Sequence, residues 1–216
     1  CQAFFAQRAP EITSLQTQIA EPGAYNDTVL EMAARLTPGE RVLEVGPGNG
    51  GLLMSLAERY PQVFGIDSST AMLQQTAQLT SRLDNIELLH GDFLSLAFAQ
   101  RFDLIVAAMT VHHLPSPPAF FARAAELLAP RGSIIVAELT RHDQHWTSGV
   151  CGDLWLGFEP SELQRWAEKA GLENCESQFL AQKNGFQIQV QRYVAAHSSA
   201  LIQTNQTNNL SKKDVT

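Results

Sequence analysis

Short apolar runs alternate with amphipathic segments along most of the chain. Five runs have the length and composition of strands, namely 41–45, 63–67, 86–90, 102–108 and 133–139, and the central ones are nearly continuous apolar runs. Four segments place apolar residues at helical spacing, namely 25–36, 52–59, 69–79 and 117–128. Strands that alternate with helices predict a parallel sheet with helices on both faces.

A further helix follows a long connection in the C-terminal third of the chain. The connection covers 141–160, and the helix covers 161–170. Ser161 or Pro160 is the expected N-cap residue, and Gly171 is the expected C-terminal stop.

Two more strands are predicted near the C-terminus, at 176–181 and 186–194. They flank Lys183-Asn184-Gly185, and Asn-Gly is a strong hairpin signal. Glutamine alternates with Ile and Val across 187–191, which predicts an antiparallel strand with one face in water. We therefore expect an α/β fold with a Rossmann-like, doubly wound, mostly parallel seven-stranded sheet and an antiparallel C-terminal hairpin.

The two ends of the chain differ from its centre. Residues 1–23 are expected to form an N-terminal helical cap that ends at Glu21-Pro22-Gly23, a strong stop signal. Residues 24–197 are expected to form the main domain. Residues 198–216 are polar with few apolar side chains, which predicts a disordered tail.

A glycine-rich loop, Gly46-Pro47-Gly48-Asn49-Gly50-Gly51, follows the first strand and precedes a helix. Glycine permits tight turns and lets a ligand approach backbone N–H groups at the helix N-terminus. Asp67 lies about twenty residues further on, at the end of the second strand, where a carboxylate can bind ribose hydroxyls. The loop alone is ambiguous, because Gly46, Gly48 and Gly51 also match the dinucleotide fingerprint G-x-G-x-x-G.

Three features favour a ligand other than a dinucleotide. Glu44 stands two residues before the loop, where a carboxylate disfavours a pyrophosphate and suits a ligand with an amino group and a sulfonium. Asp92 and Phe93 end the third strand, where they suit an adenine amino group and ring. The chain also ends in a hairpin rather than in a second mononucleotide-binding half.

At this point the sequence resembles the class I S-adenosylmethionine-dependent methyltransferases over roughly residues 25–195. The matching segments, in order, are Val42 to Gly50, Gly65 to Ser69 with Met72, Gly91-Asp92-Phe93, Phe102 to Val106, Val111-His112-His113-Leu114 and Leu127 to Ser133. Arg131 departs from the family, which usually carries a glycine there. The resemblance implies that 24–197 is a class I methyltransferase domain.

The resemblance also implies which residues bind the cofactor, S-adenosyl-L-methionine. Those implied for its methionine part are Glu44, Gly46, Gly48, Asn49 and Gly50. Those implied for ribose and adenine are Asp67, Ser68, Met72, Asp92 and Phe93. Those implied for the region of the methyl group are Ala108 and Met109, within the stretch that runs to Val111.

The acceptor side is less defined by the sequence. Histidine is the commonest general base, and the catalytic candidates are His113, His112 and His142, with His145 and Asp153 as further acid–base groups. The alternative is that the His112-His113 pair merely closes the fourth strand. No metal site is expected, because the spacing of histidine, cysteine and aspartate in 142–153 matches no firm ligand pattern.

Composition narrows the class of partner. The net charge of −7 disfavours nucleic acid, and no apolar run is long enough for a membrane helix. Three widely spaced cysteines favour a reduced, cytoplasmic compartment, and an initial Cys1 suggests a fragment, a processed product or an engineered chain. We expect a methyltransferase with a small-molecule acceptor. The alternatives are an NAD-dependent oxidoreductase and a non-catalytic cofactor-binding regulatory module.

Overall fold

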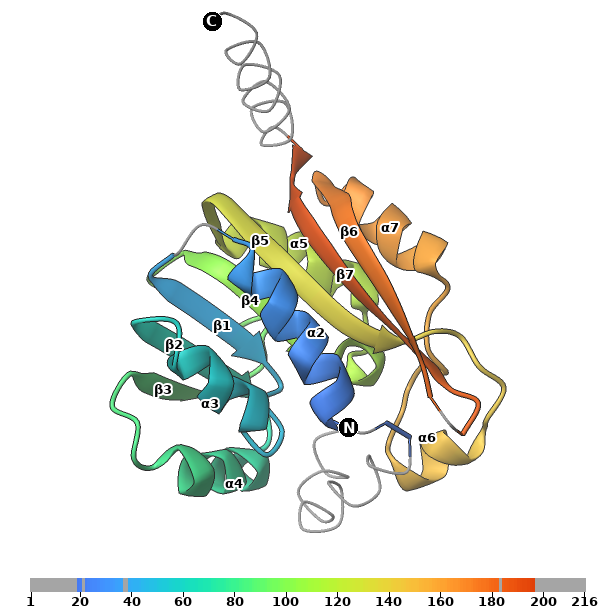
Figure 1. Ribbon diagram of the computed structural model, residues 1–216, viewed down its shortest axis with the longest axis horizontal. Helices are drawn as coiled ribbons and strands as arrows, with labels where there is room; N and C mark the ends of the chain where they lie inside the picture. The colour runs from blue at the N-terminus through green and yellow to red at the C-terminus, as the bar shows by residue number, and fades with distance from the viewer. Residues whose placement is uncertain (1–18, 21, 37–38, 183, 197–216) are drawn as a thin grey trace, which may run out of the picture.

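The computed structural model describes residues 19–20, 22–36, 39–182 and 184–196, and within them a single seven-stranded sheet is flanked by helices (Figure 1). The strands are β1 (Arg41–Val45), β2 (Gln62–Asp67), β3 (Ile86–His90), β4 (Phe102–Ala108), β5 (Leu128–Leu139), β6 (Leu172–Ala181) and β7 (Gln187–Ala195). The helices are α2 (Pro22–Ala34), α3 (Gly51–Ala57), α4 (Thr70–Thr80), α5 (Pro117–Leu127), α6 (Trp146–Val150) and α7 (Pro160–Lys169), with a 3₁₀ turn η1 (Val111–His113). The predicted fold class is confirmed.

The strand order is β3-β2-β1-β4-β5-β7-β6. The first five strands pair in parallel, whereas β7 pairs antiparallel with both β5 and β6. From β1, the strands β2 and β3 extend the sheet toward one edge. From β4, the later strands extend it toward the opposite edge, so the order reverses between β1 and β4. In open α/β sheets, ligands bind beyond the carboxyl ends of the strands at such a reversal.

Apolar side chains fill both faces of the sheet. On one face, Val29 and Met32 of α2 and Leu53 of α3 belong to one buried cluster. On the other face, Phe120 of α5 and Leu163 of α7 belong to a second cluster. Figure 1 shows α2 lying across one face of the sheet. Two covered faces explain why the central strands read as continuous apolar runs.

Several predicted boundaries are wrong. Strand β6 begins at Leu172 rather than at 176. Pro22 and Gly23 open α2 rather than end an earlier helix, because the fixed φ of proline suits the first helical turn. Strand β5 begins at Leu128, which pairs with Phe102, so the strand starts directly where α5 ends. The N-cap residue of α7 is Glu159, not Ser161 or Pro160, and proline stands inside the first turn.

The predicted wet face of β7 is also wrong, because buried side chains cover it: Tyr193, on the same face as the glutamines, belongs to the cluster that contains Phe121 of α5 and Leu163 of α7. Gln189 and Gln191 are buried, and they bond to each other instead of to water. The Gln191 amide donates to Gln189 Oε1 at 2.6 Å, and the Gln189 amide donates to the Phe158 carbonyl at 2.7 Å. Tyr193 Oη donates to Gln191 Oε1 at 2.6 Å, so a hydrogen-bonded row satisfies the buried amides.

The connection after β5 folds back onto the sheet. Thr140 and Phe158 form a parallel bridge, so the segment leaves and returns at the same place. Gly157 makes this return possible: its φ is +68°, and a Cβ there would lie 2.5 Å from the Thr140 carbonyl oxygen. The short helix α6 lies within this connection.

The ends of the chain carry two predictions that fall outside the described residues. The cap helix expected over 1–23 lies almost entirely in 1–18, and the tail expected over 198–216 lies in 197–216. Ile19 and Ala20 are described, and both are buried in the cluster beside α2. No helix among the described residues is both long and apolar enough to cross a bilayer.

Candidate active site

A cavity of about 500 Å³ lies beyond the carboxyl ends of β1, β2 and β4. Eleven of the twelve residues implied for cofactor binding line it: Glu44, Gly46, Gly48, Asn49, Asp67, Ser68, Met72, Asp92, Phe93, Ala108 and Met109. Gly50 does not. It is the N-cap residue of α3, its φ is +88°, and a Cβ there would lie 2.9 Å from Thr76 Cγ2. The predicted residues therefore gather at the reversal of strand order.

Two hydrogen bonds hold the backbone of the glycine loop, one from β2 and one from α4. The Gly46 N–H donates to the Ile66 carbonyl at 2.8 Å, and Thr76 Oγ1 donates to the Gly48 carbonyl at 2.8 Å. Gly46 has φ +69°, and a Cβ there would lie 2.6 Å from Thr110 Oγ1. Only glycine fits at this position without displacing Thr110.

Glu44 is the most unusual group in the cavity wall. It is 2% exposed, and its Oε2 has no hydrogen-bond partner among the described residues. Burial raises the pKa of Glu44 to about 8, because a desolvated carboxylate is disfavoured. A cation beside it would restore the charged form, so the position suits a ligand that carries an ammonium group.

Asp67 and Asp92 each have one carboxylate oxygen held by the next turn of the chain. Asp67 Oδ1 accepts the Ser69 N–H at 2.8 Å, and Asp92 Oδ1 accepts the Leu94 N–H at 3.0 Å. Burial raises the pKa of Asp67, against the backbone hydrogen bonds that lower it. These turns aim both carboxylates at the same cavity, where hydroxyl or amino groups of a ligand can donate to them.

The aromatic ring of Phe93 forms a fixed part of the cavity wall. The side chain is 3% exposed and belongs to the buried cluster under α5. Its ring lies 5.4 Å from the ring of Phe120 and 6.4 Å from that of Phe98. Core packing therefore sets the position of this ring.

The segment after β4 carries backbone strain. Met109 has φ +54°, and with Arg131 it is one of two non-glycine residues with positive φ in the described part of the chain. The Met109 N–H donates to the Ala137 carbonyl at 2.8 Å. Such strain persists where surrounding structure enforces it, often beside a binding site. Arg131 has φ +70°, a left-handed conformation that glycine adopts more readily than other residues.

The three predicted catalytic histidines occupy different environments. His113 lines the cavity, but His112 and His142 do not. His112 is part of η1, and its side chain is buried. His142 lies in the connection after β5, with its ring 4.8 Å from that of Phe186. Burial lowers the pKa of His142. Of the three, only His113 can meet a ligand in the cavity.

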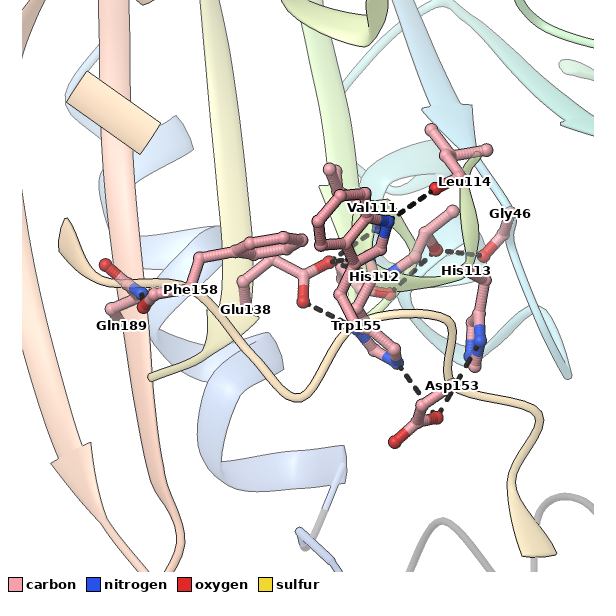
Figure 2. Close-up of polar contacts among 12 residues, drawn as sticks. Gly46, Val111, His112, His113, Leu114, Glu138, Asp153, Trp155, Phe158 and Gln189 are labelled. Carbon is pink, nitrogen blue, oxygen red and sulfur yellow. Dashed lines mark hydrogen bonds and ion pairs between the residues drawn. The ribbon is translucent and has the colours of Figure 1, made fainter. Parts of the chain in front are cut away.

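Glu138 of β5 holds the 3₁₀ turn in place (Figure 2). Its Oε1 accepts the N–H groups of Thr110, Val111 and His112 at 3.0, 2.6 and 3.3 Å. Its Oε2 accepts His112 Nδ1–H at 2.6 Å. Since Glu138 is fully buried, these four donors replace water around its carboxylate and fix the orientation of the His112 ring.

Asp153 approaches the histidines from the long connection, as Figure 2 shows. The N–H groups of Leu154 and Trp155 donate to the His112 carbonyl at 3.1 and 3.2 Å and hold the connection there. Asp153 Oδ1 lies 3.6 Å from His112 Nε2 and 3.8 Å from His113 Nδ1. We refer to His112, His113, Glu138 and Asp153 as the histidine cluster.

The two histidines of the cluster have opposite pKa shifts. Burial lowers the pKa of His112, but the charge and hydrogen bond of Glu138, together with Asp153, outweigh it and raise the net value. Burial and the adjacent His112 hold the pKa of His113 well below its ordinary value. The structure thus separates a histidine held by carboxylates from one that faces the cavity.

Sequence reasoning missed Glu138 and Tyr25, and it included Thr110 only as part of the stretch from Ala108 to Val111. Glu138 gave a signal, because it is the one charged residue in the apolar run 133–139. Tyr25 lines the cavity from α2, and burial, Glu44 and Glu138 raise its pKa. Thr110 joins the glycine loop to the cluster, since it contacts Gly46 and donates its N–H to Glu138. Tyr25 and Thr110 carry no local motif that would have identified them.

Comparison with known proteins agrees with this geometry. A family model described as a methyltransferase domain matches residues 16–177. The ubiquinone biosynthesis O-methyltransferase of Coxiella burnetii (strain Dugway 5J108-111) is 29% identical over 155 residues, covering 62% of this chain and 64% of that protein. The protein of the same name from Hahella chejuensis (strain KCTC 2396) is 30% identical over 171 residues, covering 69% of each. The chain spans a little under two thirds of the length of the Coxiella protein.

Solved structures with the same fold include enzymes that are named for different reactions. The N-methyltransferase NodS from Bradyrhizobium japonicum WM9, in complex with S-adenosyl-L-homocysteine, has a TM-score of 0.69 and 18% identity, covering 85% of this chain and 97% of that one. The [4+2]-cyclase SpnF has a TM-score of 0.74 and 15% identity, covering 90% and 94%. At these identities the likeness shows the fold alone. Because the family model spans well over half of its residues, the chain belongs to the methyltransferase-domain family.

Proposed function

We propose that this protein is an S-adenosylmethionine-dependent methyltransferase that transfers a methyl group to a small-molecule acceptor by in-line displacement. The observation that carries the proposal is Glu44, a buried carboxylate in the same cavity as the glycine loop and Asp67, whose Oε2 has no hydrogen-bond partner among the described residues. The ammonium group of the cofactor's methionine part supplies the positive charge that this carboxylate lacks.

The other cofactor contacts follow from the positions of the remaining carboxylates. Asp67 accepts from the ribose hydroxyls, and Asp92 accepts from the adenine amino group, with Phe93 in the wall beside the ring. Glu44 disfavours the alternative of NAD, because a pyrophosphate placed against the glycine loop would meet a second negative charge.

The acceptor binds on the side of Met109 and His113, which line the cavity after β4. Methyl transfer from a sulfonium needs mainly orientation and exclusion of water, because the leaving group is already good. The curated relatives are named O-methyltransferases of ubiquinone biosynthesis, which makes an oxygen acceptor the first class to test. SpnF, a cyclase with the same fold, shows why the reaction itself must be measured.

A small acceptor, rather than nucleic acid or a membrane lipid, suits the net charge of −7. A cytoplasmic location suits the cysteines, since neither Cys151 nor Cys175 forms a disulfide within the described residues.

Ligand binding tests the proposal directly. Calorimetric titration of chelator-treated protein with S-adenosylhomocysteine should give a 1:1 complex, whereas NAD should give no measurable heat. Glu44→Gln should weaken S-adenosylhomocysteine binding by about 10- to 100-fold, because the amide cannot balance the ammonium charge. Glu40→Gln is the matched control, since Glu40 is an exposed carboxylate outside the cavity, and it should leave the affinity unchanged. Binding of NAD in place of S-adenosylhomocysteine would refute the proposal.

The pH dependence of binding gives a second test of Glu44. Below pH 8 the free protein holds a proton on this carboxyl group, and binding of an ammonium group expels it. Affinity should therefore rise by up to about tenfold per pH unit between pH 6 and 8 and then level off. A flat profile in the wild-type protein would contradict this role.

Turnover separates an enzyme from a non-catalytic cofactor-binding module. Incubation with S-adenosylmethionine and a panel of phenols, amines and thiols should release S-adenosylhomocysteine with at least one acceptor class. Binding without turnover across the whole panel would favour the regulatory module.

A further inference from the structure

We propose that His112, His113 and Asp153 bind a single divalent transition-metal ion, with Zn²⁺ as the first candidate. The site goes beyond the proposed function and does not depend on it, because its ligands belong to the histidine cluster rather than to the residues proposed for the cofactor. It also departs from the expectation, drawn from sequence spacing, that the protein binds no metal.

The distances among the three side chains suit a shared ion better than direct hydrogen bonds. One ligand atom from each residue lies within 4.8 Å of the other two. Asp153 Oδ1 lies 3.6 Å from His112 Nε2 and 3.8 Å from His113 Nδ1, beyond normal hydrogen-bond length. In a tetrahedral zinc site with bonds near 2.1 Å, ligand atoms lie about 3.4 Å apart. The two distances from Asp153 Oδ1 to the imidazoles are close to this value, and the two imidazole nitrogens lie within 4.8 Å of each other.

Asp153 supplies an independent observation. Its side chain has no exposed area, yet neither carboxylate oxygen accepts a hydrogen bond within the described part of the chain. A buried carboxylate in this condition is expensive unless a cation or several donors compensate it. An ion placed between Asp153 and the two imidazoles supplies that compensation.

A void exists at the right place and of the right size. It measures about 10 Å³, which is room for one water-sized occupant, and all three proposed ligands border it. Tyr25, Met109 and His113 border both this void and the larger cavity. A three-ligand ion here would keep an open position beside the proposed acceptor site, and that one consequence rests on the proposed function.

Glu138 completes the arrangement behind the ligands. It accepts Nδ1–H of His112 at 2.6 Å, which leaves Nε2 facing Asp153. A carboxylate behind a metal-binding histidine is a common device, because it fixes the tautomer and orients the ring. Its place on β5, held by three backbone N–H groups, keeps Nε2 directed toward the void.

The donor set selects the class of metal. Two imidazoles and one carboxylate suit Zn²⁺ and neighbouring transition metals, whereas Mg²⁺ and Ca²⁺ prefer oxygen ligands alone. Of the histidines and acids in 142–153, Asp153 alone belongs to the described group whose ligand atoms converge. The spacing within 142–153 does not encode the proposed site, because the other two ligands come from η1.

Zinc binding by the whole chain tests the site. Chelator-treated protein is titrated with Zn²⁺ against a chromophoric chelator, and the zinc retained after gel filtration is measured by elemental analysis. The expected result is one Zn²⁺ per chain. Asp153→Asn and His113→Gln should each lower the affinity at least about tenfold, and Glu138→Gln should lower it by about 10- to 100-fold. His145→Gln removes an exposed histidine outside the void and is the matched control.

Each outcome decides the question. Absence of bound zinc in the wild-type protein overturns the site, as does equal affinity in wild type, Asp153→Asn and His113→Gln. Circular dichroism of each variant identifies any that fails to fold, and the remaining ligand variant then carries the test. The titration uses no cofactor, whereas the S-adenosylhomocysteine titration uses metal-free protein, so the two proposals can fail separately.

Discussion

The cavity and the histidine cluster meet at the segment that follows β4, where His113 belongs to both, but they are built in different ways. In the cavity, Glu44, Asp67 and Asp92 stand at or near the carboxyl ends of three neighbouring strands, and local turns hold Asp67 and Asp92. In the cluster, four side chains arrive from η1, from β5 and from the connection after β5. The first region is assembled from local motifs, and the second is assembled by long-range packing.

The difference also appears in how each region compensates buried charge. Glu44 in the cavity has a raised pKa and an oxygen without a partner among the described residues. Glu138 in the cluster receives four hydrogen bonds from the protein itself. A carboxylate that awaits a ligand weakens the ligand-free protein, whereas one that its own chain satisfies is part of the folded framework.

The largest effect is expected for Glu138→Gln. The amide cannot offer two acceptor oxygens, and its NH₂ group would face the N–H groups that the carboxylate now accepts. Breaking such a buried pair should lower the free energy of unfolding by about 3 to 5 kcal/mol. Urea denaturation of metal-free protein at pH 7 measures this loss, and a loss below about 1 kcal/mol would show that the cluster is not part of the framework.

Gly46→Ala tests the contact with Thr110, which joins the two regions, and it should cause the next largest loss in the free energy of unfolding. A Cβ at Gly46 would meet Thr110 Oγ1 at 2.6 Å and Cγ2 at 2.7 Å, and φ is +69°. The expected loss is about 3 kcal/mol, from left-handed backbone strain together with overpacking.

Gly171→Ala separates these two causes. Gly171 has φ +75°, but no atom of the described residues lies within 4 Å of a Cβ built there. It should therefore lose only about 1 kcal/mol, which is the backbone part alone. Equal losses in the two alanine variants would show that Thr110 moves aside without penalty.

Glu44→Gln should change the pH dependence of the free energy of unfolding, by less than Glu138→Gln or Gly46→Ala lowers that free energy. The folded pKa of about 8 lies above the ordinary value of 4.5, so the folded protein holds a proton that the unfolded chain releases between these values. Wild-type stability should therefore fall as pH rises through this window, by about 2 kcal/mol between pH 6 and 8. The variant should lack this fall. Urea denaturation at both pH values decides, and parallel pH profiles would exclude Glu44 as the source.

Glu176→Gln should have the smallest effect. Glu176 pairs with Arg35 and with Arg192, whose Nε lies 3.3 Å away, but water reaches this carboxylate. Removing its charge should change the free energy of unfolding by less than about 1 kcal/mol, and 0.5 M salt should reduce the change further. A loss as large as that of Glu138→Gln would show that burial does not distinguish these carboxylates.

Much of the cavity could be predicted from the sequence, because its determinants are local. A glycine loop between a buried strand and a helix has few possible conformations, and parallel strands bring their carboxyl ends together. Glu44, Asp67 and Asp92 therefore converge without any detailed knowledge of packing. The fold class followed from the same alternation of strand and helix.

The errors arose where one pattern fits two environments. Glutamines alternating along 187–191 suit a strand with a wet face and equally a buried strand with an internal hydrogen-bonded row. The side chains of α5 and α7 that pack on this face decide between them, and they come from other parts of the chain.

The sequence by itself determined the fold class, the position of the cavity and eleven of the residues that line it, because each of these depends on a short segment and on the geometry of parallel strands. Only the tertiary structure brought Asp153 to His112 and His113, and only it gave Glu138 its four donors. No spacing encodes these contacts. They depend on how a long connection folds back across the sheet and how completely that fold excludes water from the charges it covers.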